Sequence, residues 1–145
     1  MPHDKIIKAR EEMRKSYGFY GKLLDVFDIH ATGNDEQPVS TIAIYDNIIE
    51  YNPDFINDLE HDQIIFALAH VILLMIFKCN ERRGDRDRLI WNSACNYSIN
   101  NILVKQNIGR KTNECLLSDD YDDMIIEQIY EDLISKGFNY GQGKK

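Results

Sequence analysis

The stretch "LEHDQIIFALAHVILLMIFKCNERRGDRDRLIWNSACNYSIN", residues Leu59 to Asn100, decides the fold of this chain. Its apolar part, "IIFALAHVILLMIF", is 14 residues long, whereas a helix that crosses a bilayer needs roughly 20. The run therefore predicts a helix over about His61 to Lys78 that is buried in the core of a globular domain. A single histidine, His70, interrupts this run, and a polar segment rich in Arg, Asp and Asn follows it.

The flanking sequence predicts an α+β fold that is mostly helical and carries a small β-hairpin. Gly18 and Gly21 fall inside the first helical pattern and can break or bend it. Asp46 and Asn47 separate two β-rich runs, and both residue types tolerate the positive φ of a tight hairpin turn. The elements expected are a helix over about 5–27, a loop over 32–38, strands over 39–45 and 48–51, a short helix from 53, a charged loop or short turn around Gly84, a helix over about 89–107 and an amphipathic helix over about 121–137.

The composition indicates one globular domain over residues 1–145, with a flexible tail over 138–145. The net charge of -7 argues against non-specific binding to nucleic acid. The three cysteines, Cys79, Cys95 and Cys115, are odd in number and widely spaced, which argues against a disulfide framework. A reducing cytosol fits this usage, and the N-terminus carries no apolar leader. We therefore expect a cytoplasmic protein that does not span a membrane.

The charge is distributed unevenly along the second half of the chain. Residues 78–111 carry eight Lys or Arg and three acids, whereas residues 112–135 carry eight acids and no base. Two solvated faces that partly neutralise each other are the simplest interpretation, and a surface for a partner is the other. The residues that would form such a surface are Arg82, Arg83, Arg86, Arg88, Asp119, Asp120, Asp122 and Asp123.

The apolar helix lacks most of what a zinc hydrolase needs. Such a helix carries two histidines four residues apart and a glutamate beside the first, which accepts a proton from the metal-bound water. Counting from His70, Val71 stands at the glutamate position and Leu74 at the second histidine. Cys79 lies about 13 Å further along a continuous helix, so it could share an ion with His70 only if the helix ended first and the chain folded back. We expect His70 to be a core histidine that is hydrogen-bonded, for example to the next helix.

Several segments in order resemble a known family. They are "SYGFYGKLLDVFDI", the predicted hairpin with its Tyr-Asn-Pro end, the apolar helix, and above all Glu81 to Asn100, in which Gly-Asp-Arg-Asp precedes Trp-Asn and a spaced Asn. Over about Lys8 to Leu133 the chain resembles the predicted zinc-dependent metallopeptidase domain that occurs, in bacteria and their phages, ahead of a von Willebrand A-like domain. The resemblance implies a minimal zincin-like fold and a zinc cofactor.

The resemblance also places the expected metal site. The family's helix reads Ala-His-Glu-x-x-His with a further histidine five residues on, and its next helix carries an acidic residue. In this chain His70 matches, whereas Val71, Leu74 and Cys79 replace the glutamate and the other two histidines, and Asn96 replaces the acid. By this comparison no catalytic residue and no complete zinc site remain, and any residual metal binding would use His70 and Cys79.

These observations predict a catalytically inactive, metallopeptidase-like domain without cofactor that acts by binding another protein, as a phage or bacterial accessory factor. One alternative is a metal-dependent hydrolase with a remodelled site around His70, using Cys79 or Asn96. Another is a nucleic-acid-binding module that uses the Arg82–Arg88 cluster together with Arg110; its binding would depend steeply on salt. The sequence does not identify the protein partner or the oligomeric state.

Overall fold

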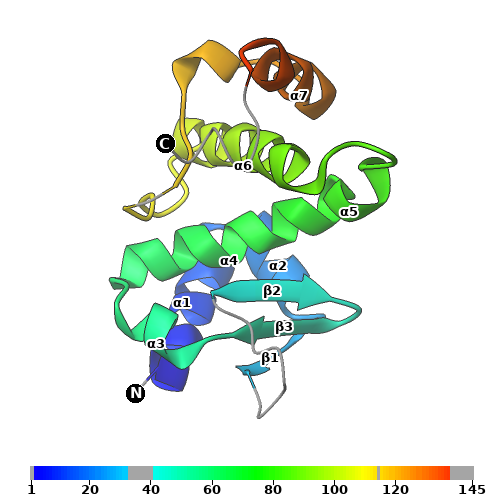
Figure 1. Ribbon diagram of the computed structural model, residues 1–145. Helices are drawn as coiled ribbons and strands as arrows, with labels where there is room; N and C mark the ends of the chain where they lie inside the picture. Colours follow the sequence, from blue (N-terminus) through cyan, green and yellow to red (C-terminus); the bar gives the residue numbers. More distant parts are fainter. Residues whose placement is uncertain (1, 33–40, 114, 138–145) are drawn as a thin grey trace.

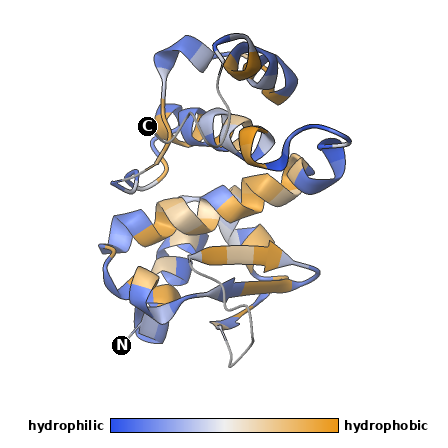
Figure 2. Cartoon of the chain, in the orientation of Figure 1, coloured by the Kyte–Doolittle hydropathy of each residue, from blue (hydrophilic) through white to orange (hydrophobic). Residues whose placement is uncertain are grey.

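The predicted apolar helix is α4, His61–Ile76, and it lies at the centre of the molecule (Figure 1). The computed structural model describes residues 2–32, 41–113 and 115–137. The sheet lies on one side of α4 and α6 on the other, and α1 also packs against it. Because α4 is covered on several sides, ten of its residues are buried and its central turns are almost wholly apolar (Figure 2). None of the described helices combines the length and apolarity that crossing a membrane requires.

The sheet has three strands, β1 (Asp28–Ala31), β2 (Ile42–Tyr45) and β3 (Ile48–Tyr51), in the order β1-β3-β2. The predicted hairpin is confirmed: β2 and β3 are antiparallel, and Asp46 in the turn has φ 50°. The sequence did not predict β1, which pairs in parallel with β3. This strand has only four residues, and parallel pairing depends on a distant segment that leaves no local pattern.

The predicted first helix is two helices, α1 (Pro2–Ser16) and α2 (Gly18–Leu24), with the break at Tyr17. Gly21 allows the two helices to approach closely. A Cβ atom at this position would lie 2.7 Å from the Cα atom of Arg14, closer than real Cβ atoms come. The glycine is therefore needed for helix contact, which explains why it interrupts an otherwise regular helical pattern.

The chain reverses direction after α4. Lys78 adopts the left-handed conformation, with φ 53°, and a short helix, α5 (Cys79–Arg82), follows where the sequence predicted a loop or short turn. The hydrophilic loop that follows (Figure 2) leads into α6 (Arg88–Lys105). The side chain of Asp87 accepts a hydrogen bond from the Ile90 amide at 2.9 Å, which caps α6. This reversal lets α6 lie beside α4 (Figure 1).

The C-terminal part packs on α6, opposite α4 (Figure 1). A single 3-10 turn, η1 (Asp119–Tyr121), precedes α7 (Ile126–Ser135). The predicted start of this helix at about residue 121 was therefore wrong. Asp123 has φ 62°, a conformation that ends helical continuity between the turn and the helix. Asn52 caps the remaining short helix, α3 (Pro53–Asn57). The predicted flexible tail, most of the 32–38 loop and the start of the first predicted strand lie outside the described residues.

Candidate functional site

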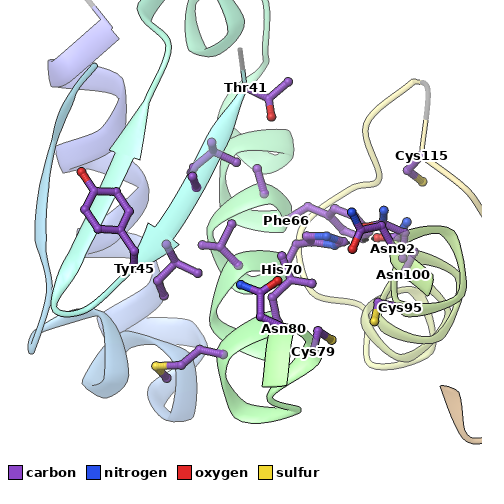
Figure 3. Close-up of a pocket in the computed structure, with 18 of the residues that line it drawn as sticks. Thr41, Tyr45, Phe66, His70, Cys79, Asn80, Asn92, Cys95, Asn100 and Cys115 are labelled. Atoms are coloured by element: carbon purple, nitrogen blue, oxygen red, sulfur yellow. Dashed lines mark hydrogen bonds between the residues drawn. The ribbon is translucent and has the colours of Figure 1, made fainter. Parts of the chain in front are cut away.

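A cavity of about 910 Å³ lies between β2, α4 and α6. Figure 3 shows His70 reaching from α4 toward α6, from which Asn92 and Asn100 project. One wall is apolar and the opposite wall, on α6, carries side-chain amides. The apolar residues that line the cavity include Ile42, Ile44, Phe55, Phe66, Val71 and Leu74, and the polar ones include Thr41, His70, Asn92, Asn96, Asn100 and Thr112.

The expected hydrogen bond between His70 and the next helix is present. Nδ1 of His70 lies 2.9 Å from Oδ1 of Asn100, and Nδ2 of Asn100 donates to the carbonyl oxygen of Leu116 at 2.9 Å. Because the Asn100 amide nitrogen is committed to Leu116, its oxygen must accept from Nδ1–H of the imidazole. This leaves the lone pair on Nε2 of His70. Burial lowers the pKa of His70, and the hydrogen bonds to Asn100 and Asn96 oppose this only in part.

The depressed pKa of His70 predicts a loss of stability in mild acid. The unfolded chain takes up a proton at about pH 6.5, whereas the folded chain does so only at lower pH. Stability is therefore full above pH 6.5 and falls below it, with a slope of at most about 1.4 kcal/mol per pH unit from this group. We expect the free energy of unfolding, measured with urea, to fall further between pH 7.5 and 5.5 for the wild-type protein than for His70→Gln. Parallel pH profiles for the two proteins would contradict this assignment.

The positions that the resemblance assigns to the metal site converge on this one cavity. Val71 and Leu74 follow His70 on α4 and line the cavity, and Asn96 lines it from α6. Cys79 also lines the cavity, because α4 ends at Ile76 and the chain folds back. The helix thus ends before Cys79 and the chain folds back, which is what His70 and Cys79 would need in order to share one ion. Val71 and Leu74 do not close the cavity that they line.

The donors around the cavity do not form a zinc site. A catalytic zinc ion takes three protein ligands and keeps one open position. The described residues contain no group of three or more His, Cys, Asp or Glu side chains that could hold a metal ion. Val71 and Leu74 have no donor atom, and the thiol of Cys79 is paired with that of Cys95. The side chains present therefore do not fit zinc, and no chemical step is derived through a metal.

Two of the arginines proposed for partner binding are used inside the molecule. The guanidinium of Arg82 pairs with the carboxylate of Glu127 at 2.6 Å. The guanidinium of Arg86 lies 4.9 Å from the ring centre of Trp91 and 5.8 Å from that of Tyr130. These contacts join α5 and the loop after it to α6 and α7. Part of the Gly-Asp-Arg-Asp and Trp-Asn block therefore holds these elements together.

The other charged candidates are more accessible. Lys105 reaches Asp122 at 3.5 Å and Asp123 at 3.8 Å across the surface, and exposed pairs of this kind contribute little to stability. Arg83 is half-buried. The exposed candidates are Arg88, Asp119, Asp120 and Asp123.

Sequence reasoning missed the amide row on α6. Asn92, Asn96 and Asn100 are spaced by four residues, which places them along one face of a helix, and all three line the cavity. The spacing was available in the sequence as a signal. The sequence did not indicate which surface this face of the helix would contact.

Comparison with known proteins supports the resemblance to a metallopeptidase-like domain. The family model described as "Putative metallopeptidase domain" matches residues 2–145. No curated protein and no solved structure matches the chain at a significant level. Because the family match covers almost the whole chain, the protein belongs to this metallopeptidase-domain family.

Proposed function

We propose that the chain is a catalytically inactive domain of zincin-like type that binds an extended segment of a partner protein in the cavity between β2, α4 and α6. It would serve as a cytoplasmic accessory factor of a bacterium or phage. The observation that carries the proposal is the edge of β2 at Ile42 and Ile44, with which no described strand pairs, and which borders a cavity where α4 presents Val71 and Leu74. A domain that descends from a metallopeptidase would need a groove for peptides, and binding would persist where the catalytic groups are replaced.

The backbone of β2 supports strand addition. The amide of Asn52 donates to the carbonyl oxygen of Thr41 at 2.7 Å, so Thr41 faces β3 in the antiparallel ladder. Backbone groups in such a ladder alternate in direction with each residue. The N–H and C=O groups of Ile42 and Ile44 therefore point away from β3. Among the described residues, no further strand pairs with this edge, and an extended peptide could do so.

The remaining walls suit the side chains of such a peptide. A peptide paired with β2 would direct alternate side chains toward and away from the cavity. Those pointing inward would meet Phe66 and Leu74 on one wall and the amides of Asn92 and Asn96 on the other. The amides can hydrogen-bond uncharged polar groups or the peptide backbone. A mixed apolar and uncharged polar segment fits this lining better than a highly charged one.

The proposed inactivity follows from the side chains next to His70. Val71 cannot accept a proton from water, and Leu74 cannot bind a metal ion. Apolar groups at these positions also avoid the cost of unpaired polar groups in a cavity without an ion. We expect no peptidase activity against unstructured protein substrates.

Substitution of Ile44 tests the peptide-binding proposal. Peptides selected from a random library against the wild-type protein are expected to bind Ile44→Pro at least about tenfold more weakly, since the variant loses an outward donor and adds a ring at the edge. The ladder with β3 does not use this N–H. Ile44→Ala is the matched control, because it loses the same side chain but keeps the N–H. Selected peptides that bind both variants equally, or a library that yields no binder, would contradict strand addition at β2.

A remodelled metal hydrolase is the second candidate, because His70 and Cys79 line one cavity. Metal analysis of protein purified without a histidine tag distinguishes the two. One tightly held zinc ion per chain, lost in His70→Ala, together with peptidase activity would establish the hydrolase. Protein without stoichiometric zinc that still binds selected peptides would support the inactive domain.

A further inference from the structure

We propose that Cys79 and Cys95 form a peroxide-sensitive dithiol, in which Cys79 is the site of oxidation and Cys95 closes an intramolecular disulfide. This inference does not depend on the proposed peptide binding. It rests on two thiols from different elements that meet at one cavity. Cys79 is the first residue of α5 and Cys95 lies within α6, and both line the cavity (Figure 3).

The two thiols are held together by the fold. Each thiol acts directly on the pKa of the other, so the two side chains lie next to each other, and neither is part of a disulfide. The Cys79 backbone is fixed on both sides. Lys78 before it adopts a left-handed turn, and Nε1 of Trp91 donates to the carbonyl oxygen of Cys79 at 2.6 Å. Because Trp91 is in the same helix as Cys95, this bond holds Cys79 against the helix that carries its partner.

The environment distinguishes the two sulfur atoms. Contact with the Cys95 thiol and the nearby charge of Arg82 lower the pKa of Cys79, although burial opposes them. The same contact and burial raise the pKa of Cys95. Cys79 is therefore the thiol that more readily becomes a thiolate, which is the nucleophilic form. Cys95 remains protonated until the second step, in which its sulfur attacks Cys79 and its proton leaves with the sulfenic hydroxyl as water.

A small oxidant can reach these sulfur atoms through the cavity. Cys79 and Cys95 are only 5% and 1% exposed, but the cavity they line is partly open to solvent. The Cys79 thiolate would attack one oxygen of hydrogen peroxide, the O–O bond would break, and hydroxide would leave. Cys79 is then a sulfenic acid. Attack of the Cys95 sulfur on the Cys79 sulfur would release water and form the S–S bond, with two electrons transferred to the peroxide overall.

The disulfide would link α5 covalently to α6 at the floor of the cavity. Cys115 provides an internal comparison, because it lines the same cavity but burial raises its pKa, and no other thiol of the described residues acts on it. A reaction governed by access alone would favour Cys115, which is half-buried rather than buried. A reaction governed by the paired thiols would favour Cys79.

Peptide mapping of the folded wild-type protein after treatment with hydrogen peroxide tests this proposal. We expect one intramolecular Cys79–Cys95 disulfide, with a mass loss of two hydrogen atoms that dithiothreitol reverses. We expect it to form about tenfold faster than any oxidation of Cys115. Cys115→Ser should form the same disulfide at the same rate.

Two variants separate the steps. Cys95→Ser should accumulate a sulfenic acid at Cys79 that dimedone traps, whereas Cys79→Ser should leave Cys95 unoxidised at the same peroxide concentration. Circular dichroism before oxidation establishes that each variant is folded. If a variant does not fold, the peptide map of the oxidised wild-type protein still tests the proposal. The proposal is overturned if Cys115 is oxidised first, if the only disulfides join two chains, or if Cys79 and Cys95 remain thiols until the protein unfolds.

Discussion

Replacing Trp91 with alanine is expected to lower the free energy of unfolding by about 3–5 kcal/mol. The indole is 0% exposed and is among the largest fully buried side chains of the core. It packs edge-on against the ring of Tyr130, at a centroid distance of 6.0 Å, and beneath the guanidinium of Arg86. Its removal would leave a large cavity where α5, α6 and α7 meet. Urea unfolding followed by circular dichroism measures the effect.

A phenylalanine at the same position separates packing from hydrogen bonding. Trp91→Phe keeps most of the apolar contact but loses the 2.6 Å bond from Nε1 to the carbonyl oxygen of Cys79. We expect it to cost about 1–3 kcal/mol, less than the alanine variant. If the dithiol proposal is correct, Trp91→Phe should also slow disulfide formation, because Cys79 is less firmly held. A loss below 1 kcal/mol for Trp91→Ala would show that this junction contributes little to stability.

A histidine in place of Leu74 is expected to create a zinc-binding site. Nδ1 of His70 is already bonded to Asn100, which is how metal-bound histidines are usually held, so a metal would bind at Nε2 in competition with the Asn96 amide. Leu74 is four residues along α4 and lines the same cavity, so Leu74→His would place two imidazoles on one face. At a zinc concentration of 100 times the dissociation constant, the variant should gain about 2.7 kcal/mol of stability.

Thermal unfolding with and without zinc measures this gain. The wild-type protein should show a much smaller shift, since it presents one histidine at the site. Leu74→Gln controls for a polar residue at this position, and Leu74→His combined with His70→Ala controls for binding by the new histidine alone. Equal zinc shifts in the Leu74→His variant with and without His70 would show that the helix does not present the two positions to one ion.

The local pattern of the sequence was sufficient for most of the helical framework. The long apolar run from Ile64 predicted α4 within two residues, because a helix covered on several sides must be apolar around most of its circumference. The Asp46-Asn47 turn predicted the hairpin, since the turn and both strands are adjacent in the chain. The start of α7 was missed because a residue such as Asp123 can adopt either helical or left-handed backbone.

The candidate site was only partly predictable. The resemblance singled out His70, Val71, Leu74, Cys79 and Asn96, and the structure brings them to one cavity. The polar partner of His70 was expected on the next helix, but its identity as Asn100 was not. The pairing of Cys79 with Cys95 was also unforeseen. Both depend on the rotation and register of α6 against α4, which neighbouring residues do not determine.

The sequence by itself determined that this chain folds as an α+β domain around one apolar helix, and that this helix carries one histidine without the glutamate and second histidine of a zinc hydrolase. Both are properties of residue type and spacing. Only the tertiary structure decided that β1 pairs with β3, that Arg82 and Arg86 clamp α7, and that Cys79 meets Cys95 at the cavity. These contacts join segments far apart in the chain, and they form because burial of the core favours one mutual arrangement of the elements over the others.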